Sequence, residues 1–342
     1  MREREPLRKN RPFVLGDTEV SPGQQATVRI PIANLYTHTP IELTVHVNHG
    51  YWSGPCLFVS GAIHGDEING VEICRRLQNE RAIRHPRGTL LTIPVVNVLG
   101  FLHQSRYFPD HRDLNRTFPG LAKGSLAAQT ADLFMRRIVA MATHGIDLHS
   151  GTRQRFNLPQ TRGKADCPVV DGMARAFGAP IHLHAGFLDG SLRAAAHEAG
   201  VHVLLFEGGE ALRLDEAVIR AGLRGIIGVM RHLGMLPDAE KNPQTPFWAP
   251  ATSSSWIRAP GSGLLLPGKR VGDLVREGEP LGRIHNPLGS EHIALTATRA
   301  GVIIGCANHP LVNQGDALFH IAFFPDAATL EPPHEGLNDE FL

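Results

Sequence analysis

The sequence lacks the features that mark several large classes of protein. No stretch approaches the roughly 18 uninterrupted apolar residues of a membrane-spanning helix, and the charged start, Met1 to Glu5, lacks the apolar stretch of a signal peptide. Lysine and arginine number 34 against 33 aspartate and glutamate, a net charge of +1 without any basic block or acidic tail. Neither nucleic acid nor a membrane is therefore favoured as a partner, and we predict a cytoplasmic protein with a small substrate.

Cysteine is also scarce. The chain has only four cysteines, and they lie far apart without a CxxC pair: Cys56, Cys74, Cys167 and Cys306. This spacing argues against a disulfide framework and against a thiolate metal site. We expect free, mostly buried thiols.

What is present is a chain of 342 residues, 42% of them hydrophobic, enough for a large α/β core and a smaller module. Residues 1–55 contain two alternating segments, 26–32 and 41–47, which suit antiparallel strands at an edge of the main sheet. From Pro55 to Leu236, short apolar runs alternate with helical stretches. This pattern predicts an α/β fold whose mixed, mostly parallel sheet is covered by helices on both faces. Strands are expected at 57–60, 89–96, 144–149 and 201–206, and helices near 67–83, 125–142, 165–177 and 214–233.

The C-terminal part has a different organisation. Residues 237–255 are rich in proline, serine and threonine, and we assign them to a linker after a catalytic domain of residues 1–236. Within 256–325, the stretch from Gly263 to Ile284 is echoed by Gly301 to Ile321. Two similar halves predict a small β-sandwich with approximate two-fold symmetry, followed by a tail over 326–342.

Three side chains that can bind a metal follow apolar runs in the larger part. His64 and Glu67 come after the run 57–60, and His149 closes the run 146–148. Two imidazoles and a carboxylate form the ligand set of a catalytic zinc ion, whose fourth position holds a water with its pKa lowered to about 7. Because α/β sheets bind ligands beyond the carboxyl ends of their strands, we expect one zinc ion at this edge.

A polar loop between these ligands carries three arginines and an asparagine: Arg106, Arg112, Asn115 and Arg116. A planar guanidinium suits a substrate carboxylate, which it holds through two parallel hydrogen bonds. We therefore expect this loop to line the substrate site.

Four short motifs together resemble the succinylglutamate desuccinylase/aspartoacylase family, a branch of the zinc carboxypeptidase superfamily. The motifs are His64-Gly65-Asp66-Glu67, Asp113-Leu114-Asn115-Arg116, Asp147-Leu148-His149 and Phe206-Glu207. The resemblance spans roughly residues 10 to 325. It implies a zinc carboxypeptidase-like fold, with zinc held by His64, Glu67 and His149.

The resemblance also implies roles for the remaining motif residues. Asn115 and Arg116 would hold a substrate carboxylate. Glu207 would be the general base and later the acid, although Glu210, three residues on, is an alternative carboxylate. Arg106 is the better match for the arginine that stabilises the oxyanion, and Arg112 is a rival.

The repeated C-terminal segment resembles the biotinyl/lipoyl barrel-sandwich domain, notably over 259–263 and 271–278. That fold would carry a cofactor on a lysine between its halves, but the connecting stretch 286–292 has no lysine. We therefore interpret this module as structural, as a lid or as an assembly surface.

Other polar residues are secondary candidates. Asp147 shares a strand face with His149 and could orient its ring. The residues Arg153, Arg155, Asn157 and Arg162 are expected in a loop after the third ligand that could line the pocket, and a structural role is favoured for them. His182 and His184 alternate in a strand with one face toward the pocket, and a structural role is favoured for them.

The leading hypothesis is a zinc-dependent amidohydrolase that releases an acetyl- or succinyl-class acyl group from a small N-acyl amino acid. One alternative is a carboxypeptidase-like enzyme acting on short peptides, and another is a zinc-binding scaffold without turnover. The resemblance extends to deacylases of N-acetyl-diaminobutyrate, so a diamino acid is one candidate substrate. The sequence leaves the acyl group, the amino acid and the oligomeric state open, a homo-oligomer included.

Overall fold

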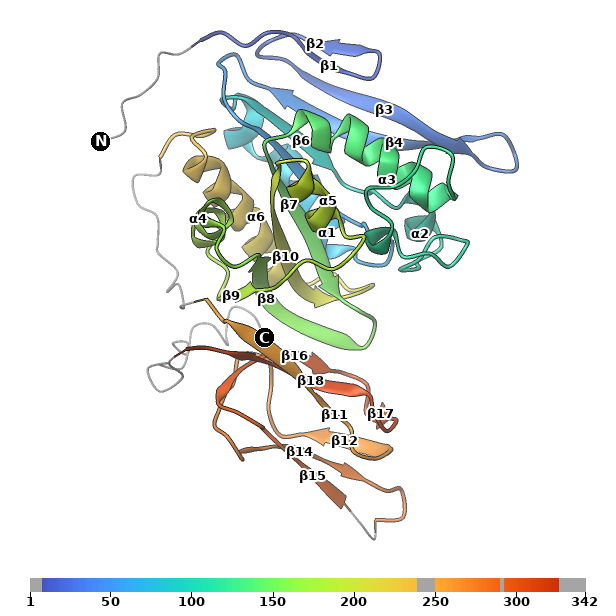
Figure 1. Ribbon diagram of the computed structural model, residues 1–342, viewed down its shortest axis with the longest axis vertical. Coiled ribbons are helices and arrows are strands. Elements are labelled where there is room, and N and C mark those ends of the chain that lie inside the picture. Colours follow the sequence, from blue (N-terminus) through green and yellow to red (C-terminus); the bar gives the residue numbers. More distant parts are fainter. Residues whose placement is uncertain (1–7, 239–249, 290–291, 326–342) are drawn as a thin grey trace.

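The structure is a computed structural model that describes residues 8–238, 250–289 and 292–325 (Figure 1). Most of the predicted linker, residues 239–249, and the predicted tail, residues 326–342, lie outside the described residues. So do two residues, 290–291, of the stretch that connects the C-terminal halves.

The described chain is built around a mixed sheet of twelve strands. Its order is β11-β18-β16-β8-β10-β7-β5-β6-β4-β3, with β9 paired to β8 and β13 paired to β16. The strands of its larger part are β3 (Gln25–Asn34), β4 (Pro40–His49), β5 (Cys56–Ser60), β6 (Thr89–Ile93), β7 (His144–Gly151), β8 (Arg155–Gly163), β9 (Ile181–His184) and β10 (His202–Glu210). The pairs β5–β6, β5–β7, β7–β10 and β8–β9 are parallel. The predicted mixed sheet is confirmed, and its parallel pairing is concentrated at the centre.

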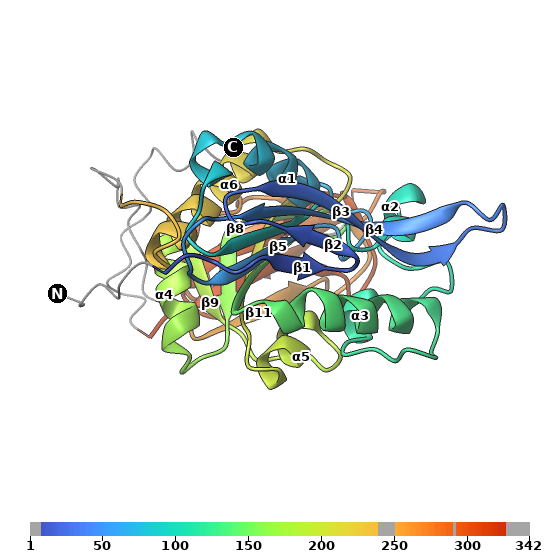
Figure 2. The same ribbon diagram turned by 90° about the horizontal axis from the view of Figure 1, so that it is seen from above.

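Helices cover both faces of this sheet. Successive residues of a strand face opposite sides, and accordingly Leu57 packs in one buried cluster while Phe58 packs in another. The first cluster includes α1 (Asn69–Asn79), α4 (Pro168–Phe177) and α6 (Glu216–His232). The second includes α2 (Val98–Leu102), α3 (Leu126–Arg137) and α5 (Leu192–Glu198). Figure 2 shows α1 and α6 on one side of the strands, with α3 and α5 on the other. Short 3-10 helices lie at η1 (Arg81–Arg84), η2 (Leu114–Arg116) and η3 (Val139–Met141).

The N-terminal segment forms the predicted antiparallel edge. Strands β3 and β4 pair antiparallel, and β4 joins the sheet through β6. In β3 the buried residues Val28 and Ile30 alternate with exposed ones, which is the pattern of a strand with one face on a core. A hairpin of β1 (Phe13–Leu15) and β2 (Thr18–Val20) precedes this edge.

The C-terminal strands extend the main sheet and also build a second one. Strand β16 (Gly301–Ala307) pairs with β8, and β18 (Ala317–Phe323) and β11 (Ser253–Arg258) follow outward. The second sheet has the order β15-β14-β12-β17. The remaining strands are β12 (Gly263–Pro267), β13 (Leu274–Val275), β14 (Pro280–His285), β15 (His292–Thr296) and β17 (Leu311–Val312).

Pairing between the two C-terminal halves is reciprocal. Strand β13 of the first half pairs with β16 of the second, and β17 of the second pairs with β12 of the first. Reciprocal pairing of this kind relates the two halves in the same way in both directions. The core of this region also contains Leu158 and Ile181 from β8 and β9, so it is continuous with the larger part. The division into separate domains and the resemblance to biotinyl/lipoyl domains stay predictions.

Two expectations about composition can be checked against the described residues. All four cysteines are free thiols, and three of them are buried, as expected. Among the helices that the structure describes, none combines the length and apolar character needed to cross a membrane.

Candidate active site

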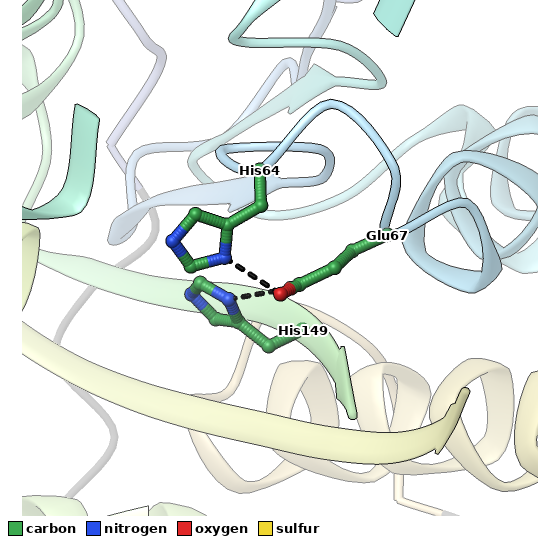
Figure 3. A group of neighbouring side chains, drawn as sticks. All are labelled: His64, Glu67 and His149. Carbon is green, nitrogen blue, oxygen red and sulfur yellow. Dashed lines mark hydrogen bonds and ion pairs between the residues drawn. The ribbon is translucent and has the colours of Figure 1, made fainter. Parts of the chain in front are cut away.

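The three predicted metal ligands converge at the carboxyl edge of the central strands. His64 and Glu67 lie in the loop after β5, and His149 lies near the end of β7, which pairs with β5. All three side chains are buried. Figure 3 shows both imidazoles pointing at the carboxylate of Glu67.

Each imidazole lies between two carboxylates. Nδ1 of His64 is 2.7 Å from Oε1 of Glu67, and its Nε2 is 3.1 Å from Oδ1 of Asp113. Nδ1 of His149 is 2.8 Å from Oε2 of Glu67, and its Nε2 is 2.8 Å from Oδ2 of Asp147. The outer carboxylates therefore fix both rings so that their Nδ1 atoms face Glu67. Asp147 makes the contact with His149 that their shared strand face predicts.

The electrostatics of the cluster favour an added positive charge. Burial raises the pKa of Glu67, but the adjacent His64 and His149 outweigh burial and hold that pKa well below its usual range. Burial lowers the pKa of His149, but Asp147 and Glu67 outweigh it and raise that pKa well above its usual value. The carboxylates thus stabilise positive charge beside the rings, whether a proton or a metal ion supplies it.

The donor set fits a divalent transition-metal ion. One ligand atom each from His64, Glu67 and His149 lies within 4.8 Å of the others. Two imidazole nitrogens and a carboxylate oxygen suit zinc and its neighbours in the first transition row. Three protein ligands leave a coordination position for water or substrate, which is the arrangement of catalytic rather than structural sites.

The backbone of the ligand loop is held in an unusual conformation. Ala62 has a φ of 47°, a left-handed value that costs energy in residues other than glycine. A Cβ atom at Gly65 would collide with the backbone of Gly100 in α2. Only glycine fits this close approach, and the contact positions His64 and Glu67 on either side of it.

The structure separates the two candidate oxyanion arginines. Nη1 of Arg106 is 3.2 Å from Oε1 of Glu67, and its Nη2 is 3.0 Å from Oδ2 of Asp113. The side chain of Arg112 pairs with Asp110 and is 60% exposed, against 22% for Arg106. Arg106 is therefore the guanidinium at the cluster, and Arg112 lies outside it.

Asn115 and Arg116 lie in η2, next to the cluster. The backbone N–H of Asn115 donates to Oδ1 of Asp113 at 2.8 Å. Oδ1 of Asn115 accepts a hydrogen bond from the backbone N–H of Leu192, at the start of α5, at 2.9 Å. Asn115 is buried, whereas Arg116 is exposed and donates to the Asn115 carbonyl. Asn115 thus belongs to the wall of the site, and Arg116 belongs to its rim.

Glu207 lies on β10 in register with His149 on β7. Paired residues of neighbouring strands point to the same face of a sheet, so the Glu207 carboxylate is on the face of the metal ligands. It accepts a hydrogen bond from Nδ2 of Asn157 at 2.7 Å, and Nη2 of Arg162 is 2.9 Å from its other oxygen. These two partners hold the carboxylate in one orientation.

The alternative carboxylate, Glu210, has a different environment. An irregularity in the pairing of β10 separates it from Glu207. Glu210 accepts hydrogen bonds from the backbone N–H of Gln154 and from Nδ2 of Asn308. It therefore joins β10 to the turn before β8 and to the C-terminal region.

One stretch that was predicted to be a loop is a strand. Residues Arg155–Gly163 form β8, which pairs antiparallel with β10 on one side and with β16 on the other. The prediction was wrong because Asn157 and Gln160 are polar yet buried inside the protein. Oδ1 of Asn157 and Oε1 of Gln160 have no hydrogen-bond partner within the described chain.

Arg193 on α5 belongs to this pocket and was not indicated by the sequence. Its side chain is buried, Nη2 donates to the carbonyl of Gly186 at 3.1 Å, and Nη1 has no partner among the described residues. Burial and the nearby Arg162 lower the pKa of Arg193 to about 10, against the opposing effect of Asp147 and Glu207. A buried guanidinium thus adds positive charge to the wall beside Glu207.

His182 and His184 do not line this pocket, contrary to the prediction. They lie on β9, on the side of β8 away from β10. Nε2 of each is 3.3 Å from Oδ1 of Asp171 on α4. The predicted alternation of the two histidines in a strand is confirmed, but the strand face that carries them packs against helix α4.

Comparison with known proteins gives a consistent set of relatives. The profile of the Succinylglutamate desuccinylase/Aspartoacylase catalytic domain matches residues 53–233. The N-alpha-acetyl-L-2,4-diaminobutyric acid deacetylase of Halomonas elongata is 27% identical to this chain over 323 residues, which cover 90% of the chain and 93% of that protein.

Solved structures share the fold. A succinylglutamate desuccinylase/aspartoacylase from Rhodobacter sphaeroides matches with a TM-score of 0.76 and 26% identity, covering 87% of this chain and 94% of that one. The product-bound ectoine utilization protein EutE from Ruegeria pomeroyi matches with a TM-score of 0.79 over 94% of this chain and 100% of that one. Its identity is 23%, so this likeness concerns the fold.

Proposed function

Because this chain belongs to the succinylglutamate desuccinylase/aspartoacylase family and is a deacylase, we propose that it is a zinc-dependent amidohydrolase acting on a small N-acyl amino acid. One observation carries the proposal. His64, Glu67 and His149 meet at one point, and Glu207 stands in register with His149 on the same face of the sheet. Three candidate metal ligands thus lie on the same face as a carboxylate, the combination that metal-assisted hydrolysis of an amide uses.

The metal ligands in this proposal are Nδ1 of His64, a carboxylate oxygen of Glu67 and Nδ1 of His149. When bound, zinc supplies Lewis-acid chemistry, because it polarises a carbonyl and lowers the pKa of water to about 7. Asp113 and Asp147 keep the two imidazoles in the ligating orientation through their hydrogen bonds to Nε2.

Glu207 moves the protons of the reaction. Its carboxylate takes a proton from the attacking water and later delivers it to the departing amine, which cannot leave as an anion at neutral pH. Arg162 and Asn157 hold Glu207 in place for both transfers. Arg106 donates hydrogen bonds to the carbonyl oxygen of the substrate as negative charge grows on it.

Asn115 and Arg116 bind the carboxylate of the amino acid. The guanidinium of Arg116 is exposed and can form two parallel hydrogen bonds to a carboxylate. Because Oδ1 of Asn115 is engaged by the backbone of Leu192, its Nδ2 is the atom that donates to the substrate. Arg162 and Arg193 place positive charge beside Glu207, which favours a neutral or anionic substrate group on that side, of the acetyl or succinyl class.

The test combines metal analysis with a substrate panel. The protein, loaded with zinc and dialysed, is assayed against N-acetyl-aspartate, N-succinyl-glutamate, N-acetyl-L-2,4-diaminobutyrate and a set of dipeptides. We expect turnover of at least one N-acyl amino acid, and its loss on chelation with recovery on adding zinc. Preference for dipeptides would instead support the carboxypeptidase-like alternative. Absence of turnover by zinc-loaded protein on the whole panel would support a scaffold and contradict the proposal.

A further inference from the structure

A second cluster of metal-binding side chains lies between helix α4 and strand β9. Asp171 comes from α4, and His182 and His184 come from the same face of β9. One ligand atom from each lies within 4.8 Å of the others. We propose that Asp171, His182 and His184 bind a second divalent transition-metal ion, of the zinc class, which ties α4 to β9.

The spacing of the donor atoms matches a shared ion. Nε2 of His182 and Nε2 of His184 each lie 3.3 Å from the same oxygen, Oδ1 of Asp171. Two ligands bound to one zinc ion at about 2.0–2.1 Å with tetrahedral angles lie about 3.3–3.4 Å apart. The observed separations fit two imidazoles and a carboxylate that share one ion.

A hydrogen bond on the far side of the ring prepares His182 for ligation. Oγ1 of Thr161 lies 3.0 Å from Nδ1 of His182 and 3.5 Å from the carbonyl oxygen of Ile181. In the tautomer that binds a metal through Nε2, Nδ1 donates its proton to this hydroxyl, the hydroxyl donates to the carbonyl, and a lone pair remains on Nε2. That lone pair faces the Asp171 carboxylate. A cation between the nitrogen and the carboxylate oxygen offsets the repulsion between these two electron-rich atoms.

The accessibility of the cluster supports this assignment. The side chain of His182 is fully buried. The side chains of His184 and Asp171 are 21% and 28% exposed, so an ion can reach the cluster from solvent.

This cluster is separate from the active site. In the pairing of β8 with β10, Gln160 is opposite Glu207 and Thr161 is opposite Phe206, so the two pairs face opposite sides of the sheet. His182 is in register with Thr161 and belongs to the face that α4 covers. An ion there lies on the other face of the sheet from Glu207 and is not a second catalytic metal.

The location indicates what the ion does. Backbone hydrogen bonds join His182 and His184 to Ala251, where the described chain resumes before β11. An ion bound to α4 and β9 therefore fixes the point at which the C-terminal region returns to the larger part. We assign it a structural role, beyond the proposed hydrolysis.

The test measures zinc per chain in the full-length protein after saturation with zinc and gel filtration. The wild type should retain two ions, and Asp171→Asn and His184→Ala should each retain one, with deacylase activity within about twofold of the wild type. Asp171→Asn keeps the shape of the side chain and guards against misfolding of the other variant. His292→Ala is the matched control, because His292 stacks on His285 in a second histidine pair and should still leave two ions.

The second site can also be examined without the first. In a His149→Ala background one ion should remain, and cobalt substitution should give the visible absorption of a low-coordinate N/O site. Adding His184→Ala should abolish that absorption. The proposal is overturned if Asp171→Asn and His184→Ala retain as many ions as the wild type, or if His292→Ala removes an ion. A single ion in the wild type that disappears with His149→Ala also overturns it, while leaving the proposed hydrolysis intact.

Discussion

Replacing Glu207 by glutamine is the most direct perturbation of the proposed chemistry. Glutamine has nearly the same shape as glutamate but cannot take a proton from water near neutral pH. The carbonyl oxygen of Gln at this position can still accept the hydrogen bond that Nδ2 of Asn157 makes at 2.7 Å. Only the ion pair with Arg162, at 2.9 Å, is lost. The variant is therefore expected to fold.

The size of the effect follows from the two roles of the carboxylate. General acid–base catalysis contributes about 10² to 10⁴ in rate, or roughly 3–5 kcal/mol of transition-state stabilisation. The side chains of Glu207 and Arg162 are 15% and 23% exposed, so their ion pair is partly screened. We expect its loss to change the free energy of unfolding by only about 1 kcal/mol. The fall in kcat should thus greatly exceed anything attributable to stability.

The assay compares kcat, zinc content and urea unfolding for the wild type, Glu207→Gln and Glu210→Gln. Glu210 lies on the same strand but is engaged by Gln154 and Asn308, which makes it a matched control. We expect full zinc in all three proteins and a kcat reduced at least 100-fold in Glu207→Gln alone. Unchanged turnover in Glu207→Gln would refute the assignment, and a large loss in Glu210→Gln instead would transfer the role to that residue.

Three further predictions concern the metal, the ligand loop and acid stability. Asp147→Asn should weaken zinc retention by about 10–100-fold in chelator competition, because Asp147 orients the ring of His149; an unchanged affinity would contradict this orienting role. Gly65→Ala should lower the free energy of unfolding by roughly 3–5 kcal/mol, since the added Cβ meets backbone. Gly186→Ala, with open space around its Cβ, should have little effect, and equal losses in the two variants would count against the close-approach argument. Burial, with Arg162 nearby, lowers the pKa of His320 to about 3. The unfolded imidazole, with a pKa near 6.5, takes a proton that the folded one does not, so this group should remove roughly 2 kcal/mol of stability between pH 7.5 and pH 5. Urea titrations should show a smaller acid-induced loss in His320→Gln, and an identical loss would show that His320 titrates normally.

The convergence of His64, Glu67 and His149 could be predicted from the sequence because each of these side chains follows an apolar run. Strand runs such as 57–60 and 144–149 end where the backbone leaves the core, and parallel neighbours end at the same edge. The topology therefore brings His64, Glu67 and His149 to one edge of the sheet. The antiparallel N-terminal edge could also be predicted, because the alternation of apolar and polar residues along a strand indicates which of its faces is buried.

What could not be predicted depends on polar residues that face the protein interior. The sequence of β8 has the composition of a loop because Asn157 and Arg162 hold Glu207, while Gln160 donates to backbone carbonyls inside the protein. Arg193 lies on a short helix where a charged residue is ordinarily exposed, but it is buried, with its guanidinium at the Gly186 carbonyl and over the ring of Phe187. Strand β8 pairs with β16, which lies far away in the sequence, and local sequence patterns do not indicate such long-range pairing.

The choice between Arg106 and Arg112 is a final prediction, because the sequence left both open. Arg106 contacts Glu67 and Asp113, whereas Arg112 is mostly exposed and pairs with Asp110. Removing one hydrogen-bond donor to a developing oxyanion typically lowers kcat by a factor of about 10²–10³. We expect a decrease of this size in Arg106→Ala. Arg112→Ala should stay within about twofold of the wild type, since exposed ion pairs contribute little. KM should separate the two roles: a guanidinium that binds the substrate carboxylate equally in the ground state and in the transition state changes KM at constant kcat. If Arg106→Ala raised KM alone, Arg106 would be a substrate-binding residue, and the oxyanion would be stabilised by another group.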